Sequence, residues 1–141
     1  MKVFTCSGAN LSGRKGSYLQ SVGNIALTCV AYVLNGVLVS GAQNGALIKW
    51  NGTSAAKPIK HHTDAIWAIE PVSNTVFVTG ANDGKIVFWG QNMAPTNTLD
   101  ITPKVKYSPG LRSMDVSANG TTMLVGTRGA DVLELDMDGN L

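Results

Sequence analysis

Short runs in which apolar and polar residues alternate recur along the chain, separated by turn residues. The clearest set comprises IWAIEPV at 66–72, TVFVTG at 75–80 and KIVFW at 85–89. A period of two is typical of β-strands that bury one face. No window of a dozen residues shows a period of 3.6, so the sequence predicts an all-β fold of short antiparallel strands.

The chain also contains an internal repeat. VSGAQNGALIKW at 39–50 aligns without a gap with VTGANDGKIVFW at 78–89, at an offset of 39 residues. A third copy, VGTRGADVLEL, ends at Leu135 and follows the second at an offset of 46 residues. The two offsets bracket the period of about 40–45 residues expected of one four-stranded propeller blade.

Asn-Gly and Asp-Gly pairs mark the predicted turns. Asn44-Gly45 and Asp83-Gly84 are equivalent in the first two repeats, and Asn35-Gly36 and Asn119-Gly120 mark the preceding turns of the first and third. Such pairs favour type I′ turns, in which both central residues have positive φ.

A shorter stretch before each repeat predicts an outer strand: SYLQ at 17–20, KPIK at 57–60 and LDIT at 99–102. The predicted organisation is therefore a partial propeller over residues 1–141, with about three four-stranded antiparallel blades. It has an outer strand at 10–19 and repeats at about 20–60, 61–101 and 102–141.

The second repeat resembles a WD-repeat blade. Trp89 stands where that family has its third-strand tryptophan, and HHTDAIWAI at 61–69 resembles the segment that precedes a blade. His62, Thr79 and Asp83 match the family's histidine, hydroxyl and turn carboxylate. The resemblance implies a chain of hydrogen bonds in which the indole meets the hydroxyl, the hydroxyl the imidazole, and the imidazole the carboxylate. A buried indole N–H and a buried carboxylate both need such partners.

The other two repeats depart from this pattern. The first keeps Ser40 and Trp50, with Asn44 in place of the aspartate and Ser21 at the histidine position. The third has Leu135 for the tryptophan and Tyr107 for the histidine. The complete network is therefore expected in the second repeat, and a partial network of Ser40, Asn44 and Trp50 in the first.

A narrower resemblance rests on NLSGRKGSYL at 10–19, VLVSGAQNGALIKWNG at 37–52 and MLVGTRGADVLEL at 123–135. Together these segments resemble the echinoderm microtubule-associated protein-like family. Members of that family have tandem propellers and bind tubulin or microtubules, so the resemblance implies that kind of partner. The family's HELP signature and N-terminal coiled coil do not occur in this sequence.

Composition narrows the class of protein further. Of the 141 residues, 14% are charged, against about 25% in typical domains, which argues against a charged disordered tail or a coiled coil. The net charge of +2 gives no support for nucleic-acid binding. No apolar run reaches about 18 residues and the N-terminus lacks a signal sequence, so no membrane association is expected. With only Cys6 and Cys29, both expected to be reduced, we expect a cytoplasmic protein, with a cytoskeletal location implied by the narrower resemblance.

The sequence predicts no catalytic site, metal site or cofactor. Both histidines, His61 and His62, lie in one dipeptide, and adjacent side chains on a strand point to opposite sides. Asp136 to Asn140 resembles the start of a calcium loop but lacks the glutamate at position twelve. Neither a phosphate-binding loop nor a nucleophile elbow is present.

A set of cations lies in or near the predicted outer strands and connections: Arg14, Lys15, Lys57, Lys60, Lys104 and Lys106. One interpretation is a basic surface for an acidic protein partner such as the tails of tubulin. The other is ordinary edge charge, which keeps outer strands from aggregating.

These observations favour a non-catalytic scaffold for protein binding, similar to the microtubule-associated propellers; the alternative is a WD-repeat adaptor unrelated to tubulin. Three blades are fewer than the usual four to eight, and the last lacks its outer strand. Two chains that exchange residues 10–19 onto residues 131–135 would close a six-bladed ring as a homodimer. The alternative is that the chain is a fragment of a longer propeller.

Overall fold

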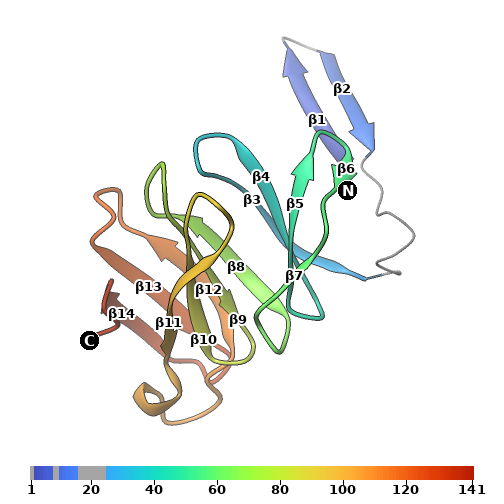
Figure 1. Ribbon diagram of the computed structural model, residues 1–141. Helices are drawn as coiled ribbons and strands as arrows, with labels where there is room; N and C mark the ends of the chain where they lie inside the picture. The colour runs from blue at the N-terminus through green and yellow to red at the C-terminus, as the bar shows by residue number, and fades with distance from the viewer. Residues whose placement is uncertain (1, 8–9, 16–24) are drawn as a thin grey trace.

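A computed structural model describes residues 2–7, 10–15 and 25–141 of the chain (Figure 1). Within these ranges the regular structure is almost entirely antiparallel strand, and the helical part is one 3₁₀ turn, η2 (Thr102–Lys104). Three sheets follow one another along the chain and lie side by side in Figure 1. The prediction of an all-β fold is confirmed.

The first sheet contains β3 (Leu27–Val33), β4 (Val37–Ala42) and β5 (Ala46–Asn51). Two short strands, β6 (Ser54–Ala55) and β7 (Ile59–Lys60), both pair with β5 and form its outer edge. The outer strand predicted at 57–60 is therefore too long by two residues. Pro58 has no N–H to donate to a ladder, which explains why pairing begins only at Ile59.

The second sheet contains β8 (Ile66–Pro71), β9 (Phe77–Ala81), β10 (Lys85–Trp89) and β11 (Pro95–Asp100). The first three agree with the predicted strands to within two residues at each end. The outer strand predicted at 99–102 was wrong in position, because it begins at Pro95 and ends at Asp100. The Asp100 carboxylate accepts the N–H of Thr102 at 2.8 Å, and Pro103 continues the η2 turn, so the chain leaves the sheet there.

The third sheet contains β12 (Leu111–Val116), β13 (Thr122–Thr127) and β14 (Val132–Asp136), in that order. Among the described residues no fourth strand pairs with β14, as the sequence predicted for the last blade.

Near the N-terminus, β1 (Lys2–Ser7) and β2 (Asn10–Lys15) form an antiparallel hairpin. The sequence predicted a single outer strand at 10–19 and did not predict β1. Residues 16–19, and the SYLQ stretch at 17–20, lie outside the described residues.

The repeat seen in the sequence is reproduced in the strand register. Each sheet has a β-bulge in its first strand, followed by a small residue that pairs with a glycine of the second strand. The equivalent triplets across the three strands are Cys29–Gly41–Leu47, Ala68–Gly80–Ile86 and Ser113–Gly126–Val132.

In all four predicted turns the glycine follows the central pair, because its N–H donates to the carbonyl three residues earlier. In the first turn Leu34, Asn35 and Gly36 all have positive φ, of 47°, 57° and 111°, so the central pair is Leu34-Asn35. In the other three turns the glycine alone has positive φ, of 82° at Gly45, 75° at Gly84 and 68° at Gly120. One residue in the left-handed region is the arrangement of longer hairpin loops, in which a right-handed turn precedes the glycine.

The core lies between the sheets. One apolar cluster joins the first sheet to the second and includes Val39, Leu47, Ile66, Phe77 and Trp89. Another joins the second sheet to the third through the residues Val78, Ile86, Phe88, Leu111, Met123 and Val125. Each sheet therefore depends on its neighbour to cover one apolar face.

Candidate functional site

A buried chain of hydrogen bonds ties the loop before β8 to the strands β9 and β10. The Trp89 indole Nε1–H donates to the Thr79 hydroxyl at 2.9 Å, and that oxygen lies 2.8 Å from His62 Nε2. On the other side of the ring, His62 Nδ1 lies 3.0 Å from Asp83 Oδ2. The His62 and Asp83 side chains are 0% and 5% exposed. The structure thus brings together all four residues of the expected network.

The donors and acceptors determine the tautomer of a neutral His62. A carboxylate only accepts, so Nδ1 carries the hydrogen toward Asp83, while Nε2 accepts from the Thr79 hydroxyl. Burial raises the pKa of the Asp83 carboxyl, but the hydrogen bond and the electrostatic attraction of the His62 ring, with the N–H groups of Thr63 and Lys85, outweigh it. The net pKa of Asp83 is lowered below its ordinary value of 3.8.

This lowered pKa predicts an acid-dependent loss of stability. The contribution of ionised Asp83 is fully present above its ordinary pKa of 3.8 and is lost as the pH falls through the lowered value in the folded state. We expect Asp83→Asn to reduce the free energy of unfolding at neutral pH, and the difference from the wild type to shrink below about pH 4. Urea denaturation of both proteins between pH 3 and 7 measures it; a difference independent of pH would contradict this assignment.

The first and third sheets have less of the network. Trp50 Nε1–H donates to Ser40 Oγ at 2.8 Å, while the Asn44 side chain accepts the N–H of Ala46 within its own turn. Ser21 lies outside the described residues. In the third sheet, Leu135 fills the tryptophan position with 1% exposure, and Tyr107 is 63% exposed and so takes no part in a buried network.

The predicted cations occupy separate parts of the fold. Lys57 and Lys60 are both exposed; Lys57 precedes the short strand β7 of the first sheet and Lys60 is its last residue. Lys104 ends η2, and exposed Lys106 follows it with Nζ 5.5 Å from the Tyr107 ring centroid, so both lie between the second and third sheets. Arg14 and Lys15 are in β2, and their side chains are outside the described part of the structure.

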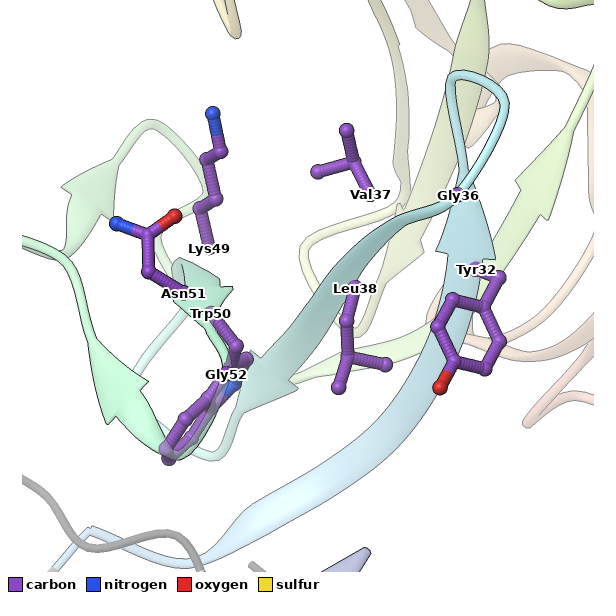
Figure 2. Close-up of a pocket in the computed structure, with 8 residues that line it drawn as sticks. All are labelled: Tyr32, Gly36, Val37, Leu38, Lys49, Trp50, Asn51 and Gly52. Carbon is purple, nitrogen blue, oxygen red and sulfur yellow. The ribbon is translucent and has the colours of Figure 1, made fainter. Parts of the chain in front are cut away.

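An apolar row crosses the first sheet on the side away from the second. Tyr32, Leu38 and Trp50 are aligned on β3, β4 and β5, and they line a pocket of about 340 Å³ with Lys49 and Asn51 (Figure 2). Figure 2 shows the Tyr32 and Leu38 side chains directed away from those of Val37 and Lys49. Tyr32 is 63% exposed, and Val30 on the same strand is 58% exposed.

Comparison with known proteins shows which known fold the three sheets resemble. No family model and no curated protein matches the chain. Among solved structures, it is similar to the crystal structure of the WD40 beta propeller domain of Doa1, with a TM-score of 0.59 and 19% identity over 72% of this chain. The three sheets have the fold of WD40 β-propeller blades. The match covers 33% of the chain in that structure, so the present chain spans about a third of its length.

Several titratable residues outside the network also make contacts within the blades. His61, beside the network, lies edge-on to Trp89 with ring centroids 5.8 Å apart. In the part of the chain that the structure describes, no three histidine, cysteine or acidic side chains gather as metal ligands. Burial raises the pKa of the free Cys29 thiol. Asp136 accepts the N–H groups of Asp138 and Asn140, which makes the 136–140 segment a closed turn.

Over the described residues, no helix is long and apolar enough to cross a membrane.

Two surface features of the blades were not predicted. Tyr32 and Val30 alternate with residues that face the second blade, a signal present in the sequence but readable only once the packed side of β3 is known. Arg112 lies over the Trp67 ring, with its guanidinium carbon 4.6 Å from the centroid. This pair joins the bulges of the second and third blades, which are 45 residues apart in the sequence.

Proposed function

We propose that the chain is a non-catalytic scaffold for protein binding, in which the WD40 blades present exposed side chains to a protein partner. The observation that carries this proposal is the pair of apolar side chains that β3 exposes on the outward face of the first blade, Tyr32 and Val30, which are both more than half exposed. Tyrosine is favoured in protein interfaces because its ring is apolar and its hydroxyl can hydrogen-bond. His62 and Asp83, a pair suited to proton transfer, are instead enclosed in the network.

As the finer form of this function we propose microtubule binding in the cytoplasm, at the cytoskeleton. The resemblance to the echinoderm microtubule-associated protein-like family supports it, together with the exposure of Lys57, Lys60 and Lys106. Long-range attraction to acidic tubulin tails would use these charges. The alternative is an adaptor that binds another protein through the apolar row and does not bind tubulin.

Co-sedimentation with microtubules across a salt series tests this proposal. We expect the chain to pellet at low salt and retention to fall as salt screens the charges. A variant with glutamate at Lys57, Lys60, Lys104 and Lys106 should lose most of the retention, whereas Lys85→Glu, an exposed lysine outside the set, should retain it. Failure of the folded chain to pellet at low salt would contradict microtubule binding and favour the adaptor.

For the edge of β14, which has no partner strand among the described residues, we propose two alternatives. One is a strand-exchanged homodimer, in which residues 10–19 of one chain pair with β14 of the other, and the second is that the chain is a fragment of a longer propeller. For the homodimer, light scattering should give twice the 14.8 kDa of one chain. A soluble monomer would contradict the exchange and favour the fragment of a longer propeller.

A further inference from the structure

Adjacent blades fit together through a glycine slot. A Cβ at Gly41 of the first blade would lie 2.8 Å from Ile66 Cβ of the second, and a Cβ at Gly80 of the second would lie 2.6 Å from Leu111 Cδ2 of the third. Ile66 and Leu111 are both 0% exposed. In each case the glycine of a second strand therefore makes room for the aliphatic residue that begins the neighbour's first strand.

The third blade carries the same slot on its outward face. Gly126 occupies the position of Gly41 and Gly80, but the described atoms nearest to a Cβ there all belong to Ser113 of the same blade. Val132 and Leu124 beside it are 76% and 50% exposed. A shallow pocket of about 170 Å³ lies over these residues.

The row beside this third slot carries two carboxylates, against one, Glu70, in the second blade and none in the first. The row of side chains two residues along the strands from Gly126 consists of Asp115, Leu124 and Glu134, aligned across the third blade. Both carboxylates are exposed. The equivalent rows are Ala31–Val39–Lys49 in the first blade and Glu70–Val78–Phe88 in the second.

The next row along the strands is also more polar in the third blade than in the first two. Ser117 and Thr122 stand where the first two blades have pairs of valine, at Val33 with Val37 and at Val72 with Val76. An apolar neighbour packed over this face would remove water from two carboxylates without giving them a partner, which is unfavourable. A neighbour that places cations against the two carboxylates would form ion pairs with them instead.

We infer that this face of the third blade binds an extended basic segment of a partner protein. The segment places an isoleucine, leucine or valine side chain in the slot at Gly126 and lysine or arginine side chains against Asp115 and Glu134. Alternate side chains of an extended strand lie on one side about 7 Å apart, so the cation is two residues from the aliphatic residue. The inference rests on the proposed scaffold function and names the chemistry of one partner. It is an alternative to the closed homodimer, in which a second chain would cover this face.

Titration of the ¹⁵N-labelled chain with the peptide Lys-Ser-Ile-Ser-Lys, acetylated and amidated at its ends, tests the inference by NMR, because its isoleucine and lysines lie on one side of an extended strand. We expect the largest amide shifts at Leu124, Gly126 and Val132, with at least tenfold weaker binding of Lys-Ser-Ala-Ser-Lys and Glu-Ser-Ile-Ser-Glu. Largest shifts elsewhere, no binding, or equal binding of either control peptide would overturn the inference.

Two variants separate the slot from the charges. Asp115→Asn with Glu134→Gln, and separately Gly126→Val, should each weaken the peptide at least tenfold, while Asp138→Asn, an exposed carboxylate in the turn after β14, should not. Urea denaturation establishes that each variant is folded. If Gly126→Val leaves the affinity unchanged, or converts a dimer into a monomer, the assigned occupant is wrong.

This result is independent of microtubule binding, which uses lysines outside this face. Retention on microtubules with no binding of the peptide would contradict the inference alone. Peptide binding without retention would contradict only the tubulin partner.

Discussion

Replacing Trp89 with alanine is expected to lower the free energy of unfolding by about 3–5 kcal/mol, the range for removal of a fully buried aromatic side chain. The ring is 0% exposed and stacks on Phe77, with centroids 6.1 Å apart and planes at 11°. Its loss also removes the indole donor to Thr79. The cavity would lie between the first and second blades, where backbone on both sides limits collapse. Urea denaturation monitored by circular dichroism measures the change.

Trp67→Ala is the matched control, because Trp67 is the same residue type in the same blade but half-buried and in contact with Arg112 at the surface. We expect it to cost less than half as much. Trp89→Phe should cost about 1–2 kcal/mol, since it keeps a ring and loses mainly the hydrogen bond and some volume. Equal losses for Trp67→Ala and Trp89→Ala would contradict the central position of Trp89.

Gly45→Ala is expected to cost about 2–5 kcal/mol, the sum of left-handed backbone strain and a steric clash. Gly45 has a φ of +82°, and a Cβ there would lie 2.5 Å from the His62 carbonyl oxygen and 2.8 Å from that of Asp64. Both contacts are backbone atoms of the segment that leads into the second blade, so no side-chain rotation relieves them. The free energy of unfolding, again from urea denaturation, is the quantity to compare.

Gly52→Ala separates strain from clash. Its φ is +60°, but nothing lies within 4 Å of the added Cβ, so we expect a loss of about 1 kcal/mol from strain alone. If Gly45→Ala costs no more than Gly52→Ala, the first turn does not pack against the loop that carries His62.

The second blade could be predicted from the sequence because its contacts are short in sequence and its polar residues have few alternatives. Trp89 and Thr79 are ten residues apart, across one hairpin, and a buried indole must find an acceptor. The same argument predicted Ser40 and Trp50 in the first blade, where the hydrogen bond has the same span. Asn44 shows the limit of this argument, because its side-chain oxygen accepts the N–H of Ala46 within the turn and so needs no partner from the network.

The acidic face and the exposed apolar row could not be predicted, because each depends on which side of a strand a neighbouring blade covers. Asp115 and Glu134 are 19 residues apart and meet across Leu124 only when the bulge in β12 sets the register. Outer strands were the least accurate part of the prediction. Their side chains are mostly exposed, as in β11, so alternation carries little information about where pairing starts and ends.

The central claim is that the blades stack through glycine slots and that the third slot remains accessible to a partner. The most direct measurement is the loss of unfolding free energy on Gly→Ala substitution at positions 41, 80 and 126. Gly41→Ala and Gly80→Ala should each cost about 1–3 kcal/mol by overpacking against Ile66 and Leu111. Gly126→Ala should cost less than about 0.5 kcal/mol, because only the exposed Ser113 side chain must move. Three equal losses would contradict the claim.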